Sequence, residues 1–216
     1  MNRVLLLVEG QTEETFVGVL LQPYFARMGL YFTPIIVETS SGHKGGMVSY
    51  VKVKKQIKRL CNDTAAHVST MFDLYALPDD FPGKSSPKWE QCRNGADKAA
   101  FVEQEMVYDI DRPNFIPYIQ VHEFEALLFT NPSHFLRWVD DPQTVHKLQK
   151  VQAGCAPEDI NDNKNTTPSK RILSVMPTFQ KVVHGSSIAR SIGLDAMRSA
   201  CPHFDGWLKK LETFVN

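Results

Sequence analysis

Apolar and polar positions alternate in two patterns over the first part of the chain. Residues 3–8 form a continuous apolar run after one charge, which is typical of a strand buried on both faces of a parallel sheet. Residues 12–28 then place apolar side chains at helical spacing, with Thr12 as the N-cap and Gly29 as the terminator. A second strand over residues 32–38 completes a strand–helix–strand unit.

The alternation continues through the next eighty residues. The spacing predicts a second helix over residues 47–60, a third strand over 68–72 and a third helix over 96–110. Residues 115–121 predict a fourth strand, in which Pro117 favours an edge position because proline cannot donate to a neighbouring strand.

These elements predict an α/β fold with a mainly parallel sheet flanked by helices. Beyond residue 126 the pattern is mainly helical. We therefore expect a core over residues 1–130 and a helical extension over residues 131–216 that packs on it as part of a single globular unit.

Composition and charge narrow the functional classes. The chain has 24 Lys and Arg against 24 Asp and Glu, and 43% of its residues are hydrophobic, so global disorder is excluded. Zero net charge argues against a nucleic-acid coat or a basic membrane-surface protein. The apolar run Val4–Val8 is too short for a membrane span or a secretory signal. The four cysteines form no C-x-x-C pair, so we expect a cytoplasmic protein without a zinc-finger site.

Carboxylates follow three of the predicted strands. Glu9 comes after the first, Asp73 after the third, and Glu123 with Glu125 after the fourth. Because the carboxyl ends of parallel strands share one edge of a sheet, we expect these groups to converge. Gathered carboxylates repel one another unless a divalent cation lies between them, and Mg²⁺ or Mn²⁺ suits such a site. A cation held in this way can assist phosphodiester cleavage.

The choice among the further oxygen ligands stays open at this point. Glu123 and Glu125 share a face only if their segment is extended, and we favour Glu123 because it lies closer to the strand end. Asp79 and Asp80 lie in a Pro- and Gly-rich loop, where turn formation explains them equally well.

Basic residues suggest contacts with phosphate. His43 and Lys44 lie in a glycine-containing loop whose backbone N–H groups can approach a phosphate. Lys170 and Arg171 stand at the start of a predicted helix, where free N–H groups already favour an anion, and Lys170 can act there as an electrostatic clamp on the reacting phosphate. The basic helix face over residues 52–59 would attract a phosphate backbone, or it is simply solvated.

Several segments of the chain resemble the Toprim domains of primases, topoisomerases and overcoming-lysogenization-defect nucleases. The resemblance begins with Glu9-Gly10 after the first strand, in the string VLLLVEGQTEETF. Together with TMFDLYALPDDFPG, VHEFEALLF and TPSKRI, it extends over nearly the full length. The whole set is similar to an uncharacterised Toprim-like family of bacteria, a domain of unknown function often encoded beside an ATPase in phage-defence neighbourhoods.

The resemblance implies a Toprim-like core in which Glu9 is a metal ligand or general acid/base. Toprim domains carry Asp-x-Asp after the third strand, but this chain has Tyr75 at the place of the second Asp. Asp79, Asp80 or Glu123 would then supply the missing oxygen.

Two functional hypotheses follow from these patterns. The first is a Mg²⁺- or Mn²⁺-dependent nuclease, a phage-defence effector acting with an ATPase partner, in which Glu9, Asp73 and Glu123 hold the metal and Lys170 or Arg171 grips phosphate. Its substrate would be DNA, RNA or a nucleotide, and the sequence does not choose among them. The second is a catalytically weak Toprim-like module that binds an ATPase and responds to it.

Overall fold

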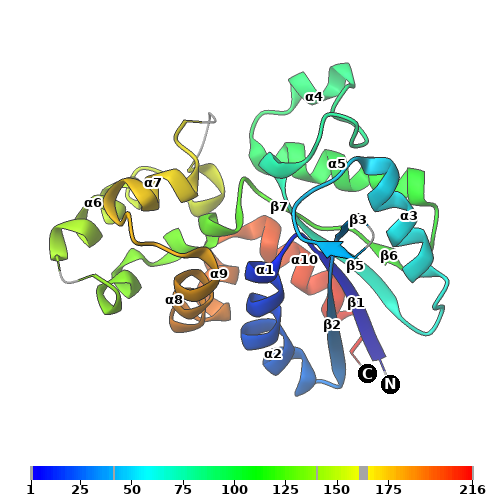
Figure 1. Ribbon diagram of the computed structural model, residues 1–216, viewed down its shortest axis with the longest axis horizontal. Coiled ribbons are helices and arrows are strands. Elements are labelled where there is room, and N and C mark those ends of the chain that lie inside the picture. Colours follow the sequence, from blue (N-terminus) through cyan, green and yellow to red (C-terminus); the bar gives the residue numbers. More distant parts are fainter. Residues whose placement is uncertain (1, 41, 140, 161–164, 216) are drawn as a thin grey trace.

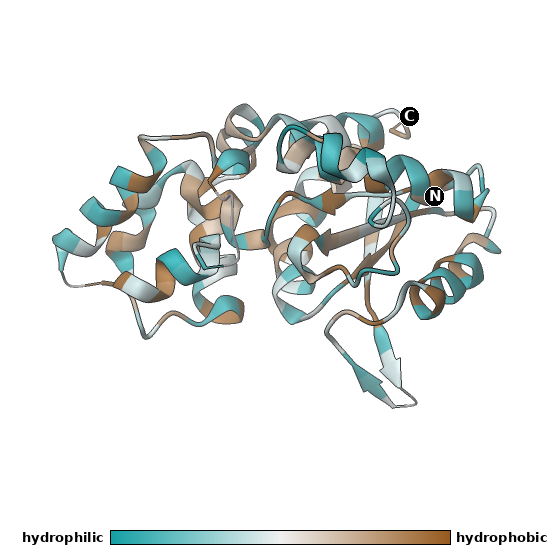
Figure 2. Cartoon of the chain, turned by 90° about the horizontal axis from the view of Figure 1, so that it is seen from above, coloured by the Kyte–Doolittle hydropathy of each residue, from teal (hydrophilic) through white to brown (hydrophobic). Residues whose placement is uncertain are grey.

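A parallel sheet forms the centre of the protein (Figure 1). The computed structural model describes residues 2–40, 42–139, 141–160 and 165–215. The strands follow the spatial order β2-β1-β5-β6, and β7 also pairs with β5, every pair being parallel. The strands are β1 (Asn2–Val8), β2 (Leu30–Ile36), β5 (His67–Asp73), β6 (Phe115–Ile116) and β7 (Ile119–Gln120). A separate antiparallel hairpin, β3 (Glu38–Ser40) with β4 (His43–Lys44), projects from the body (Figure 2).

Helices cover both faces of the sheet and continue into the C-terminal half. The first half contains α1 (Gln11–Phe16), the π-helical turn η1 (Val17–Leu21), α2 (Gln22–Ala26), α3 (Tyr50–Cys61), the short turn η2 (Leu74–Ala76), α4 (Pro87–Gln91) and α5 (Gly95–Ile110). The second half contains η3 (Phe124–Thr130), η4 (Pro132–Arg137), α6 (Pro142–Gln152), η5 (Pro157–Asp159), α7 (Pro168–Val175), the π-helical turn η6 (Lys181–Gly185), α8 (Ser186–Ile192), α9 (Leu194–Ala200) and α10 (Pro202–Glu212). The α/β fold expected from the sequence is therefore confirmed.

The continuous apolar run in β1 reflects burial on two faces. Val4, Leu6 and Val8 pack into one hydrophobic cluster together with α1, α2 and α10. Leu7 points the other way, into a second cluster that α3 and α5 complete. Because successive strand residues alternate between faces, a strand covered on both sides has to be apolar throughout.

The order of the strands reverses beside β1. The chain passes from β1 to β2 on one side of β1, and then crosses to β5 on its other side. In open α/β sheets, ligands bind outside the carboxyl ends of the strands at such a reversal of strand order. Here the two strands at the reversal are β1 and β5. Glu9 directly follows β1, and Asp73 is the last residue of β5.

Some boundaries differ from those expected from the sequence. The fourth strand is divided into β6 and β7 around Pro117, and both parts pair with β5. The first helix begins two residues early, with Gly10 rather than Thr12 as its N-cap, and contains η1 in its middle. Gly29 follows this helix with a positive φ of 81°, a conformation that glycine adopts without strain.

The C-terminal half packs on the first half of the chain through α10 and α8. Trp207 of α10 stacks on Tyr118 with ring centroids 4.3 Å apart, and its indole N–H donates to Ser69 Oγ of β5 at 3.0 Å. Helix α8 packs against α1, whereas α6 and α7 lie farther from the sheet (Figure 1). The domain boundary at residue 130 stays a prediction. None of the described helices has the length and apolar character that a membrane span requires.

Candidate functional site

Glu9 and Asp73 meet at the carboxyl edge of the sheet. Strand β1 pairs with β5 up to Val8 opposite Met71, so Glu9 comes one residue and Asp73 two residues after the paired segment. The backbone N–H of Asp73 favours the ionised form of Glu9, and the Glu9 carboxylate in turn raises the pKa of Asp73. The structure therefore brings Glu9 and Asp73 together, as we expected from the sequence.

Two further carboxylates share this edge. Glu13 lies one turn into α1, where its Oε2 accepts a hydrogen bond from the Gly10 backbone N–H at 3.0 Å. Glu125 lies in η3 and is fully buried. Both residues raise the pKa of Asp73. We call Glu9, Glu13, Asp73 and Glu125 the carboxylate cluster.

Among the residues that the structure describes, one ammonium group faces the carboxylate cluster. Lys181 begins the π-helical turn η6, which packs against α1, and its Nζ lies 3.0 Å from Glu125 Oε2. Burial lowers the pKa of Lys181, but the nearby carboxylates of Glu125 and Asp73 outweigh this effect and raise it. Lys181 is therefore protonated at neutral pH. Its positive charge lowers the pKa of Glu9, Asp73 and Glu125 in return.

A single ammonium does not compensate the burial of four carboxylates. Burial, followed by the charge of Glu13, raises the pKa of Glu9 to about 7. Burial also raises the pKa of Glu125 to about 7, and it raises the pKa of Asp73 well above its usual value. The cluster thus resists full ionisation at neutral pH in the absence of further positive charge.

Asp73 is held in place by the backbone of the segment that follows β7. Its Oδ1 accepts a hydrogen bond from the Phe124 N–H at 2.8 Å, which joins the end of β5 to the start of η3. Just before this contact, His122 has a positive φ of 62°, an uncommon conformation for a residue other than glycine. The turn at His122 directs the neighbouring side chains Glu123 and Glu125 to different places.

Glu123 and Glu125 reverse the preference expressed from the sequence. Glu123 Oε2 accepts a hydrogen bond from the Ser169 backbone N–H at 2.9 Å, so this carboxylate is engaged at the start of α7. Glu125 enters the cluster, and Glu123 lies close beside it: burial is the largest cause of the raised pKa of Glu125, and the charge of Glu123 adds to it. The reason is local: the segment leaves the extended conformation at His122 and enters a 3-10 helix, so alternation no longer decides which side chain faces the edge.

Asp79 and Asp80 contact residues outside the carboxylate cluster. The Asp79 side chain is fully exposed, and its carboxylate lies 3.6 Å from Lys84 Nζ. Asp80 Oδ2 accepts a hydrogen bond from the Tyr50 N–H at 2.8 Å, at the start of α3. Both carboxylates therefore serve the loop and helix around them, and the structure does not bring them to the cluster.

The basic residues expected to bind phosphate are also dispersed. His43 and Lys44 form the exposed strand β4 of the projecting hairpin. Arg171 donates to the backbone carbonyls of Thr166 at 2.7 Å and Ile160 at 3.2 Å, so it ties together its own loop. The Lys170 side chain is exposed on α7, and the cation in contact with the cluster is Lys181.

Tyr75, which stands in the place of the second Asp of the Toprim pattern, belongs to an aromatic pair. Its hydroxyl lies 3.1 Å from His122 Nδ1, and the two rings are stacked with centroids 5.3 Å apart. Burial lowers the pKa of His122, so the neutral ring is favoured. Gly95 lies against this ring, where a Cβ would come within 2.7 Å of His122 Cε1.

Sequence reasoning missed Glu13 and Lys181. The position of Glu13 in the first turn of a helix is fully explained by the helix dipole, so nothing in the pattern distinguishes it. Lys181 comes from a distant segment without a motif. The one local signal is the GQTEE string, which places Glu13 four residues after Glu9 and within reach of it.

The chemistry of the carboxylate cluster fits a divalent cation, although its ligand set is incomplete. Glu9 Oε2 and Glu125 Oε1 are buried and find no hydrogen-bond partner among the described residues. Within the same part of the chain, no group of three His, Cys, Asp or Glu side chains is arranged to hold a metal ion. A cation bound here would thus rely on one or two carboxylates and complete its coordination with water or phosphate, as Mg²⁺ commonly does.

Comparison with known proteins places the chain in a family. No curated protein matches it significantly. The solved C-terminal region of the Xanthomonas campestris pv. campestris OLD protein is similar, with 15% sequence identity, a TM-score of 0.41 and coverage of 97% of each chain. The model of the family described as "Domain of unknown function (DUF4276)" matches residues 8–212, a range that contains the whole carboxylate cluster and Lys181. The chain therefore belongs to the DUF4276 family.

Proposed function

We propose that this chain is a divalent-cation-dependent phosphoryl-transfer enzyme, a nuclease with a Toprim-like core that cleaves phosphodiester bonds. One observation carries the proposal. Four carboxylates gather around a single ammonium at the reversal of strand order, and two of their buried oxygens find no hydrogen-bond partner among the described residues. This arrangement costs stability by itself, and an arriving cation would offset that cost.

The imbalance of charge favours a hard cation over other ligands. Carboxylate oxygens are the ligands that Mg²⁺ and Mn²⁺ prefer. We infer that Glu9 and Asp73 hold the cation, because their carboxylates end neighbouring strands of the sheet. When bound, a divalent cation would supply Lewis acidity toward a phosphoryl oxygen. Phosphate is a natural further ligand, because Mg²⁺ sites typically include substrate phosphates.

The side chains of the cluster divide the remaining tasks. Glu9, whose pKa is about 7 without a cation, is suited to moving a proton near neutral pH. Lys181 is fixed against Glu125, with its side chain about half exposed. Its ammonium can therefore balance negative charge that develops on a phosphate at this edge. Glu13 is held by the Gly10 N–H and sets the negative potential around Glu9.

Cleavage of labelled nucleic acid tests the proposal. Purified protein is incubated with single- and double-stranded DNA and with RNA, each in Mg²⁺, Mn²⁺ or EDTA. We expect cleavage of at least one substrate with Mg²⁺ or Mn²⁺ and none in EDTA. Absence of cleavage in every combination, or cleavage that persists in EDTA, would contradict the proposal.

A second function is favoured by one specific observation. Tyr75 replaces the second Asp of the Toprim pattern and is engaged with His122, and no three metal-binding side chains come together in the described ranges. A catalytically silent module that binds an ATPase partner, and responds to it, would have no need of a complete metal site. The two functions differ in whether the isolated chain binds a divalent cation.

Thermal unfolding with and without cation distinguishes the two functions. A ligand that binds only the native state raises the free energy of unfolding by about 2.7 kcal/mol at a hundredfold excess over Kd. We therefore expect the melting temperature to rise by several degrees with excess Mg²⁺ or Mn²⁺, and Glu9→Gln to abolish this rise. An unchanged melting temperature in the wild type would favour the silent module.

A further inference from the structure

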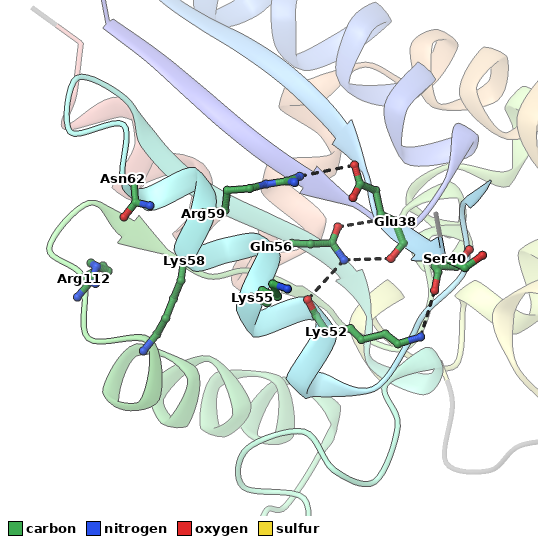
Figure 3. A pocket seen from close by; sticks show the side chains of 10 residues that line it. Glu38, Ser40, Lys52, Lys55, Gln56, Lys58, Arg59, Asn62 and Arg112 are labelled. Atoms are coloured by element: carbon green, nitrogen blue, oxygen red, sulfur yellow. Dashed lines mark hydrogen bonds and ion pairs between the residues drawn. The ribbon is translucent and has the colours of Figure 1, made fainter. Parts of the chain in front are cut away.

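A groove with basic walls runs along the outer face of α3. It has a volume of about 680 Å³, and its walls come from α3, from β3 and from Arg112 beyond α5 (Figure 3). The cations that line it are Lys52, Lys55, Lys58, Arg59 and Arg112. The one carboxylate in its lining is Glu38, which forms an ion pair with Arg59 at 3.5 Å. We call this feature the α3 groove.

The helical pattern of α3 produces the row of cations. Val53 and Ile57 are fully buried against the sheet, so the lysines between them are turned outward. Lys52, Lys55 and Arg59 follow the spacing of one helical face. This row spans roughly 10 Å along the helix axis, given a rise of about 1.5 Å per residue.

The opposite wall of the α3 groove is anchored to the helix. Gln56 accepts a hydrogen bond from the Glu38 N–H at 2.9 Å and donates one to the Glu38 carbonyl at 3.1 Å. Lys52 Nζ donates to the Thr39 carbonyl at 3.2 Å (Figure 3). These bonds hold β3 alongside α3, so the groove is preformed. A preformed site has less conformational entropy to lose on binding.

The wall of the α3 groove that β3 forms is joined by backbone hydrogen bonds to the end of β1, where Glu9 lies. Strand β3 follows directly on Val37, whose N–H donates to the Val8 carbonyl at 3.0 Å at the end of β1. After the hairpin, the Gly46 N–H donates to the Glu9 carbonyl at 3.0 Å. Gly46 has a positive φ of 83°, which permits this return of the chain. The hairpin thus connects the groove wall to Glu9.

We propose that the α3 groove binds the phosphate backbone of a nucleic-acid strand that continues toward the carboxylate cluster. This inference rests on the proposed function and names its substrate class. All the described residues that line the groove are polar or charged. A protein partner would be expected to find apolar or aromatic anchors, whereas a phosphate backbone needs closely spaced cations.

Fluorescence anisotropy with a labelled DNA or RNA strand tests the inference, with EDTA present so that no cleavage occurs. The groove variant Lys55→Gln/Lys58→Gln is compared with the control Lys147→Gln/Lys150→Gln, which removes two lysines from α6. Each lost phosphate contact reduces the magnitude of the negative slope of log K against log salt by about 0.7 for a single strand. We therefore expect the groove variant to lose about 1.4 from this slope and to bind on the order of tenfold more weakly at 0.1 M salt.

The remaining outcomes decide against the inference or separate it from the proposed function. Equal binding by the groove variant and the wild type overturns it, as does a wild type that binds no strand below about 100 μM. Displacement of the strand by polyglutamate at equal charge concentration would identify an acidic protein as the ligand. Groove-dependent binding without cleavage in Mg²⁺ or Mn²⁺ leaves the inference standing and overturns the proposed function. Cleavage at the wild-type rate by both the groove variant and Arg112→Gln overturns the inference and leaves the proposed function standing.

Discussion

Glu9→Gln and Asp73→Asn are each expected to lower the rate of cation-dependent phosphodiester cleavage at least a hundredfold. Each substitution removes one negative charge from the pair of carboxylates that we assign to the cation. The loss of a single preorganised electrostatic contact in an active site commonly costs about 10²–10³ in rate. The measurement is the initial rate of cleavage at saturating Mg²⁺ or Mn²⁺.

The two substitutions preserve the shape of the edge, so a loss of activity can be read as chemistry. In Asp73→Asn, the amide oxygen can still accept the hydrogen bond that the Phe124 N–H donates to Asp73 Oδ1. In Glu9→Gln, the side chain keeps its length. Asp195→Asn is the matched control, because it removes an exposed carboxylate of α9 and should retain the wild-type rate. Cleavage that survives both site substitutions would exclude the carboxylate cluster as the active site.

Glu9→Gln is also expected to make the cation-free protein more stable above neutral pH. The pKa of Glu9 is about 7 in the folded state against 4.5 ordinarily, so the folded state binds more protons than the unfolded state between these values. The free energy of unfolding therefore falls as the pH rises through this window. Full ionisation costs up to about 3 kcal/mol, and Gln removes this cost. The variant should match the wild type near pH 4.5 and exceed its stability at pH 8.

Urea unfolding in EDTA at several pH values measures this difference. Groups outside the carboxylate cluster whose pKa values are shifted, including His203, titrate in both proteins, and their contributions largely cancel. Excess Mg²⁺ at pH 8 should reverse the order, because the wild type gains binding energy that the variant lacks. A variant that is less stable than the wild type at pH 8 in EDTA, or a difference that does not vary with pH, would contradict the charge balance described here.

The fold could be predicted from the sequence because its strands are buried on both faces. An apolar run such as residues 4–8 has few alternatives in a chain of this composition, and the helices between such runs are strongly amphipathic. The break in the fourth strand was only partly foreseen: Pro117 indicated an edge, but not the division into β6 and β7. That division depends on pairing with β5, which is a long-range property.

The candidate site was predictable where backbone geometry alone positions a residue. Glu9 and Asp73 were found because strand ends converge in any parallel sheet. From the sequence we favoured Glu123 over Glu125, because no sequence pattern indicates the left-handed backbone conformation of His122. Lys181 could not be found, because its position depends on how a helical segment without a motif packs against α1.

The late position of Lys181 in the chain has a consequence for biosynthesis. Glu9, Glu13, Asp73 and Glu125 all leave the ribosome before the ammonium that partly neutralises them. Until η6 docks on α1, repulsion among the four acids opposes closure of the edge. A nascent or truncated chain that ends before residue 181 would therefore lack a formed carboxylate cluster, and the edge would close only when synthesis is nearly complete.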